Sequence, residues 1–121
     1  MNWPLRQEHA WDLSPREAIA IQRELAPMVR QAPLSAPPRT VAGIDVSIRG
    51  DVAQPAIVVV DVQSGQVIDQ AALRMPVAFP YVPGLLSFRE MPALLPALER
   101  LTVRPDAFML DAQGLAHPRR F

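Results

Sequence analysis

The part of the sequence that most restricts the fold is a close succession of three strand-like stretches, at residues 40–48, 56–62 and about 66–73. In the first stretch apolar side chains alternate with small or polar ones, which is typical of a strand with one buried face. One face carries Ala42, Ile44, Val46 and Ile48, and the other carries Gly43, Asp45 and Ser47. Because the linkers are too short for a crossover helix, the three strands are predicted to form an antiparallel meander.

A helix is predicted before the meander, over residues 15–30. Ser14 can cap it, Pro15 is tolerated at the first helical position, and Glu17 stands where a capping box needs an acid. Apolar residues then recur at helical spacing. The next residues, 31–39, hold three prolines and a serine, so they should form an extended connector.

Proline also divides the chain after the meander. Residues 74–87 contain three prolines and a glycine among aromatic residues, which predicts a stiff loop without regular structure. Leucines at helical spacing predict a second helix at about 91–102. Its start stays open, because Pro92 fits a first turn whereas Pro96 would remove an internal hydrogen bond from a helix that began at Ser87.

A last apolar stretch, residues 107–111, is predicted to be a strand. A strand reached through a crossover helix normally runs parallel to an earlier one, and a place beside the first strand would bring Asp111 near Asp45. The fold class is therefore α/β, with a mixed sheet of three antiparallel strands, a crossover helix and a parallel fourth strand. Since no later helix covers the second face of this sheet, we expect residues 1–121 to form one incomplete domain.

Three carboxylates are candidates for chemistry. Asp45 alone is most simply a solvated carboxylate, and Ser87 with Glu90 has the spacing of a capping box. Two aspartates on adjacent strands, however, repel each other unless a cation lies between them, and Mg²⁺ is held by one or two carboxylates together with substrate phosphate. Such a pair suits phosphodiester hydrolysis. Glu90, at the start of the crossover helix, would lie near the strand ends where Asp45 and Asp111 meet.

The C-terminal half also holds candidates for substrate contacts. The aromatic, proline-rich tract at residues 79–84 is either a packed surface loop or a tip that enters a base stack. His117 fits a metal ligand, a base contact or an ordinary loop histidine. Arg119 and Arg120 suit phosphate, although arginines near a terminus are usually solvated.

Composition narrows the class of protein. With 12 basic and 12 acidic residues the net charge is zero, which by itself argues mildly against a self-sufficient nucleic-acid binder. The sequence has no cysteine, so a metal site must use oxygen or imidazole ligands. No targeting segment or membrane span is recognisable, and we expect a cytoplasmic protein without membrane contact.

Three motifs, in this order and spacing, resemble the endonuclease V (deoxyinosine 3′ endonuclease) family. They are Val41-Ala42-Gly43-Ile44-Asp45-Val46-Ser47, Pro80-Tyr81-Val82-Pro83-Gly84-Leu85-Leu86-Ser87-Phe88-Arg89-Glu90 and Asp111-Ala112-Gln113-Gly114-Leu115-Ala116-His117-Pro118-Arg119-Arg120-Phe121. The stretch Gln22-Arg23-Glu24-Leu25 is similar too. The resemblance covers nearly the whole chain and corresponds to the N-terminal half of the family's fold.

The resemblance implies an RNase H-like fold and a Mg²⁺-dependent cut, with Mn²⁺ as a substitute, at the second phosphodiester 3′ of deoxyinosine in DNA. It implies that Asp45 and Asp111 bind the metal and that Glu90 supports them as the third catalytic carboxylate. The tract Pro80, Tyr81, Val82, Pro83 and Gly84 matches the family's strand-separating wedge, with Tyr81 at its tip, and Gly84, Leu86 and His117 match the pocket for the deaminated base.

The sequence departs from the family in two ways. Ala112 replaces the glycine usual after the second aspartate, and its Cβ could narrow the pocket or oppose a positive φ. The family's later metal-site residues lie in a C-terminal half that would have to come from elsewhere, so we expect little cleavage by this polypeptide alone. Two alternatives stay open: an endoribonuclease specific for inosine, and a nucleic-acid-binding remnant without catalysis.

Overall fold

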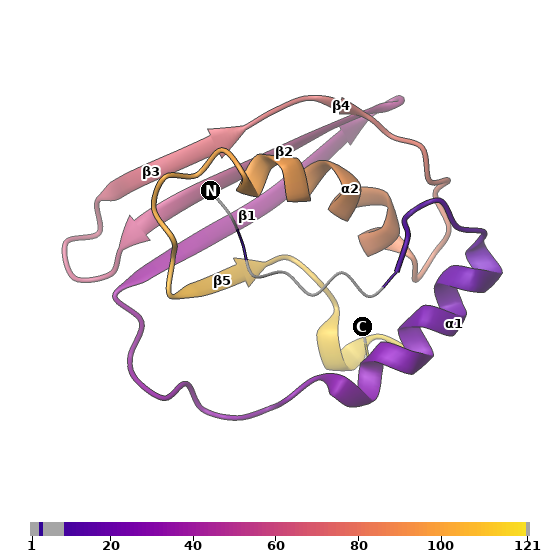
Figure 1. Cartoon of the computed structure of the whole chain (residues 1–121), viewed down its shortest axis with the longest axis horizontal. Helices are drawn as coiled ribbons and strands as arrows, with labels where there is room; N and C mark the ends of the chain where they lie inside the picture. The colour runs from indigo at the N-terminus through magenta and orange to yellow at the C-terminus, as the bar shows by residue number, and fades with distance from the viewer. Residues whose placement is uncertain (1–2, 4–8, 121) are drawn as a thin grey trace.

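The computed structural model describes residue 3 and residues 9–120, which form one mixed sheet and two main helices (Figure 1). In chain order the elements are α1 (Pro15–Leu25), η1 (Ala26–Met28), β1 (Thr40–Arg49), β2 (Val52–Asp61), β3 (Val67–Ala72), β4 (Met75–Pro76), α2 (Leu86–Leu98), β5 (Ala107–Leu110) and η2 (Gly114–Ala116). Helix α2 lies along the sheet, whereas α1 lies at its end, beside the C-terminal segment.

The sheet has the predicted topology. Its strand order is β3-β2-β1-β5, with β4 paired to β2. Strand β2 pairs antiparallel with both β1 and β3, and β5 pairs parallel with β1. The antiparallel meander and the parallel fourth strand are therefore confirmed.

Strand β2 begins at Val52, four residues before the predicted start. Pro55 lies inside it, although proline cannot donate a ladder hydrogen bond. The carbonyl of Pro55 accepts a hydrogen bond from the amide of Leu73. The nitrogen of Pro55 lies on the same side of the strand, so it faces the gap between β3 and β4, where no ladder hydrogen bond is required. This position explains why the strand passes through the proline.

Helix α1 has the predicted start but ends early. The capping box of Ser14 and Glu17 is confirmed, since each side chain accepts a hydrogen bond from the other residue's backbone amide. The helix ends at Leu25 rather than near residue 30 and continues only as the short η1. Pro27 has no N–H for a bond four residues back, which accounts for the shorter helix.

Helix α2 departs most from the sequence-based prediction. It begins at Leu86 rather than 91, runs through Pro92 and Pro96, and ends at Leu98 rather than 102. The capping-box interpretation of Ser87 was wrong, because Ser87 lies within the helix and the N-cap residue, Leu85, makes no side-chain cap hydrogen bond. Burial of one helix face outweighs the two lost backbone bonds. The buried residues of this face are Phe88, Ala93, Leu94, Ala97 and Leu98.

The loop before α2 also contains regular structure that was not predicted. Met75 and Pro76 form β4 against the start of β2, and the last two residues of the predicted loop, 86–87, belong to α2. Proline is tolerated in β4 because this two-residue strand pairs only with β2.

Two apolar clusters hold these elements together. The first lies between α2 and the sheet and contains Ala42, Ile44, Ile57, Val59, Ala71, Leu94, Ala97, Leu98 and Leu101. The second joins α1 to the loop before α2 and contains Ala18, Phe79, Leu85 and Phe88. No helix of the described residues is long and apolar enough to cross a lipid bilayer.

Candidate active site

The two predicted aspartates meet where β1 and β5 run side by side. In the parallel register Ile44 of β1 is opposite Leu110 of β5. Asp45 directly follows Ile44, and Asp111 directly follows Leu110. Both aspartates are exposed to solvent, as expected for residues outside the buried face of the sheet. The pairing of the two strands thus brings together two carboxylates that are 66 positions apart in the sequence.

Glu90 adds a third carboxylate from α2. It is half-buried, and its pKa is raised by burial first, then by the charge of Asp45 and then by that of Asp111. A carboxyl group near two other carboxylates resists ionisation because the negative charges repel. Burial together with this repulsion, rather than helix capping, distinguishes the environment of Glu90.

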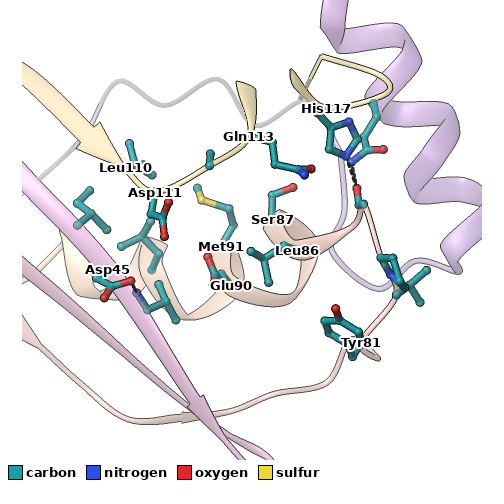
Figure 2. A pocket seen from close by; sticks show the side chains of 18 residues that line it. Asp45, Tyr81, Leu86, Ser87, Glu90, Met91, Leu110, Asp111, Gln113 and His117 are labelled. Atoms are coloured by element: carbon teal, nitrogen blue, oxygen red, sulfur yellow. Dashed lines mark hydrogen bonds between the residues drawn. The ribbon is translucent and has the colours of Figure 1, made fainter. Parts of the chain in front are cut away.

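One pocket of about 520 Å³ contains nearly all of the predicted site (Figure 2). Asp45, Glu90 and Asp111 lie on one side of it, and Tyr81 and His117 lie on the other. The pocket is lined by Gln22, Ile44, Asp45, Val46, Tyr81, Val82, Pro83, Gly84, Leu86, Ser87, Glu90, Met91, Leu94, Leu110, Asp111, Ala112, Gln113 and His117. Of the predicted site residues only the exposed Pro80 is not in this lining.

The proline-rich loop presents one exposed aromatic residue on an anchored base. Tyr81 is 72% exposed, whereas Phe79 and Leu85, on either side of it, are buried in the second apolar cluster. Arg89 donates to the carbonyl of Phe79 at 2.8 Å, and the amide of Leu85 donates to the carbonyl of Val82 at 3.0 Å. The loop therefore holds Tyr81 out into solvent from a fixed position.

His117 is buried and hydrogen-bonded through both ring nitrogens. Its Nδ1 accepts from the backbone amide of Arg119 at 3.0 Å, so Nε2 carries the proton and donates to the carbonyl of Gly84 at 2.7 Å. The structure thus places His117 at the wall of the pocket and away from the carboxylates, with both ring nitrogens used within the protein, which argues against a role as metal ligand.

Sequence reasoning gave no role to Gln22 and expected Arg119 to face phosphate or solvent. Gln22 is completely buried, donates to the Gly84 carbonyl at 2.8 Å and accepts from Nε of Arg119. Arg119 is half-buried and also reaches the Gly84 carbonyl, at 3.4 Å. The one available signal was a glutamine on the inward face of an amphipathic helix.

The N-terminus of α2 opens beside the pocket. The first N–H groups of a helix have no partner within it, and Leu85 supplies no side-chain cap. Leu86 and Ser87, the first two residues of α2, both line the pocket, so the uncapped end of the helix lies beside it.

Ala112 does not strain the backbone. Among the described residues other than glycine, a positive φ occurs only at Arg120, so the Cβ of Ala112 causes no conflict of the kind considered from the sequence. Ala112 lines the pocket, where its methyl group takes some of the space.

The acidic cluster suits a hard divalent cation in its chemistry. Oxygen ligands are those that Mg²⁺ prefers, and a cation would relieve the repulsion by Asp45 and Asp111 that adds to burial in raising the pKa of Glu90. Across residue 3 and residues 9–120, however, no three acidic, histidine or cysteine side chains are grouped closely enough to hold a metal ion. Metal binding by Asp45, Glu90 and Asp111 stays a prediction.

The fold and the site together define an RNase H-like α/β domain with a carboxylate-lined pocket. The sequence model of the Endonuclease V family matches residues 23–121. The chain belongs to the endonuclease V family.

Known proteins of this family resemble the chain in sequence. Endonuclease V of Roseiflexus castenholzii is 47% identical over 113 residues, which cover 93% of this chain and 51% of that protein. Endonuclease V of Methanothrix thermoacetophila is 44% identical over 121 residues, which cover 100% and 53%. The chain spans about half the length of the curated relatives it matches.

Solved structures resemble it as well. Endonuclease V of Streptomyces avermitilis superposes with a TM-score of 0.84 at 41% identity, covering 93% of this chain and 51% of that one. Endonuclease V of Ciona intestinalis, in complex with a 24mer DNA containing an inosine followed by a ribo-adenosine, superposes with a TM-score of 0.76 at 25% identity, covering 87% and 48%. The predicted RNase H-like fold is confirmed, and the chain corresponds to about half the length of these structures.

Proposed function

We propose that this chain carries the lesion-recognition pocket and three acidic residues of a metal-dependent endonuclease that hydrolyses the second phosphodiester 3′ of deoxyinosine in DNA. The observation that carries the proposal is the single pocket with Asp45, Glu90 and Asp111 on one side and Tyr81 and His117 on the other. Carboxylates in the same pocket as an aromatic loop tip and a buried histidine allow recognition of a base and cleavage of a nearby phosphodiester.

Recognition is attributed to the backbone around the start of α2. Deamination of adenine replaces an amino group, a donor, by a carbonyl, an acceptor. The open amides of Leu86 and Ser87 are donors, so they favour the carbonyl and leave the amino group of adenine unmatched. Tyr81, exposed at the tip of an anchored loop, would fill the gap in the base stack when the lesion is turned out.

Cleavage is attributed to the acidic cluster. A bound Mg²⁺, or Mn²⁺ in its place, would supply an activated water and neutralise the charge that develops on the phosphate. Asp45 and Asp111 would hold the metal ion, and Glu90 would support these two ligands as the third carboxylate. Because the described residues do not form a complete ligand set, we expect binding of the lesion to exceed cleavage when this polypeptide is used alone.

The test is incubation of the 121-residue chain with Mg²⁺ and a labelled duplex that carries one deoxyinosine, alongside the same duplex with adenine. Binding is measured in parallel by fluorescence anisotropy. We expect preferential binding of the deoxyinosine duplex and little nicking. Equal binding of the two duplexes would contradict the recognition role, and efficient nicking one nucleotide beyond the lesion would contradict the expectation of low activity.

A second candidate substrate is inosine in RNA. The Ciona intestinalis endonuclease V structure contains DNA in which a ribo-adenosine follows the inosine, so a ribonucleotide is present next to the base in a related protein. Two binding measurements decide between DNA and RNA as the substrate. One uses a single-stranded RNA with one inosine, and the other uses the DNA of the same sequence. Tighter binding of the RNA would favour the endoribonuclease.

A binding module without catalysis is the third possibility, and metal dependence distinguishes it. If the acidic cluster belongs to an active site, Mg²⁺ and nucleic acid should each tighten binding of the other. A Mg²⁺ titration that leaves the affinity for the deoxyinosine duplex unchanged would favour the non-catalytic module.

A further inference from the structure

Gln22 is a polar residue in a place where an apolar one would normally be. It lies on the inward face of α1, next to the second apolar cluster, and is completely buried. An amide is costly to bury unless its hydrogen bonds are satisfied, and both ends of this one are used. Its Nε2 donates to the carbonyl of Gly84, 62 residues away, and its Oε1 accepts from Arg119, 97 residues away.

The Gly84 carbonyl receives three donors from two distant segments. His117 donates at 2.7 Å, Gln22 at 2.8 Å and Arg119 more weakly at 3.4 Å. A carbonyl oxygen has two lone pairs, so the two short bonds saturate it. The direction of the Gly84–Leu85 peptide is therefore held by α1 and by the C-terminal segment together.

This peptide leads into Leu85, the N-cap residue of α2. Gly84 has φ +85°, a left-handed conformation that favours glycine. Because glycine has many other backbone conformations and no side chain to pack, contacts to its carbonyl must hold it in this one. Leu85 makes no side-chain cap hydrogen bond, and the first two helical residues, Leu86 and Ser87, line the pocket. Contacts that fix the Gly84 carbonyl therefore restrict the direction in which the backbone enters α2, and with it the direction of the Leu86 and Ser87 amides.

We infer that Gln22 is a positioning residue for base recognition: with Arg119 and His117 it clamps the Gly84 carbonyl and so aims the first amides of α2 into the pocket. The inference rests on the proposed function for its effect on base selectivity, whereas the clamp itself can be measured without any ligand. Gln22 and Arg119 act through Gly84 and are not expected to touch the base.

The test replaces Gln22 by methionine, which has a similar volume but cannot make either hydrogen bond. We expect the preference of the 121-residue chain for a deoxyinosine duplex over an adenine duplex to fall about fivefold, the effect of one misaligned hydrogen bond. The fall should come from weaker binding of deoxyinosine, with adenine binding unchanged. Gln22→Met with an unaltered preference would overturn the inference.

A matched control removes a hydrogen bond far from the pocket. Thr102 donates from its hydroxyl to Asp69 at 3.1 Å, in the turn after α2. Thr102→Val should leave the deoxyinosine preference unchanged. An equal loss of preference in Thr102→Val and Gln22→Met would show that general loosening, and not the clamp, sets selectivity.

A double variant separates a shared clamp from independent effects. If Gln22 and Arg119 act on the same carbonyl, Gln22→Met combined with Arg119→Met should lower the preference less than the product of the two single effects. Effects that multiply would refute a common clamp.

Amide hydrogen exchange measures the clamp directly, with no nucleic acid present. The Leu85 amide is protected by its bond to the Val82 carbonyl, and we expect its exchange to accelerate at least fivefold in Gln22→Met, while Thr102→Val leaves it unchanged. If the unaltered chain shows no deoxyinosine preference, the proposed function fails and Leu85 exchange alone decides the clamp. Unchanged Leu85 exchange in Gln22→Met would refute it.

Discussion

Gly84→Ala should destabilise the fold by about 3 kcal/mol, for two separate reasons. At φ +85° an alanine is strained, which costs about 1–2 kcal/mol. The added Cβ would also stand 2.8 Å from a guanidinium nitrogen of Arg119 and 3.4 Å from Nε2 of His117. Moving Arg119 away breaks its bond to Gln22, and a hydrogen bond to a charged group contributes about 1.5 kcal/mol.

Gly50 supplies the matched control for this substitution. It has φ +58° in the turn between β1 and β2, and an added Cβ would meet nothing within 4 Å. Gly50→Ala therefore carries the backbone strain alone, about 1 kcal/mol. Comparing the two alanines isolates the contribution of the contacts around Arg119.

Urea unfolding, followed by the fluorescence of the two tryptophans, measures both variants. With a slope of about 1.5 kcal/mol per molar urea, the midpoint should fall by about 2 M for Gly84→Ala and by about 0.7 M for Gly50→Ala. Equal midpoints for the two variants would refute the reasoning, because they would mean that Arg119 gives way without loss.

Further predictions concern the acidic cluster, the loop tip and the core. Because the pKa of Glu90 is raised in the folded state, the free energy of unfolding falls as pH rises from 4.5 through that pKa. Glu90→Gln should therefore add about 0.5 kcal/mol to the free energy of unfolding at pH 7, after allowance for solvent screening, and nothing below pH 4. Urea unfolding without metal measures both values. An equal gain at both pH values would contradict this electrostatic origin. Tyr81→Ala should change the free energy of unfolding by less than about 0.5 kcal/mol, since the ring is exposed, yet weaken deoxyinosine binding in anisotropy; unweakened binding would exclude the wedge role. Phe88→Ala should cost about 4 kcal/mol in thermal or urea unfolding, and a cost under 1 kcal/mol would contradict its place in the core. In a chain completed with the family's C-terminal half, Asp45→Ala should abolish Mg²⁺-dependent nicking in a gel assay, and retained nicking would exclude Asp45 as a metal ligand.

Local patterns in the sequence were enough to predict the sheet and the acidic residues. Strict alternation along β1 placed Asp45 on the face opposite Ala42 and Ile44, because side chains of a strand alternate with a period of two. The crossover rule for parallel strands then brought Asp111 beside Asp45. Both arguments need only neighbouring residues and a general topological rule.

The bounds of α2 and the strand position of Pro55 were decided by tertiary structure. Local rules treat proline as a breaker, yet burial of Phe88 and Leu94 carries α2 past Pro92, and a gap in the sheet makes the N–H missing from Pro55 harmless. Whether a proline is tolerated depends on what lies opposite its nitrogen, which the neighbouring residues do not reveal.

The strand alternation, the capping box at Ser14 and the grouping of Asp45, Glu90 and Asp111 near one edge of the sheet could all be predicted from residue order. The meeting of Gln22 and Arg119 at the carbonyl of Gly84, and the start of α2 before Ser87, so that Ser87 and Glu90 form no capping box, became visible only in the folded domain. The physical reason is range: periodicity and capping depend on residues a few positions apart, whereas these contacts join segments whose approach is set by the packing of the whole domain.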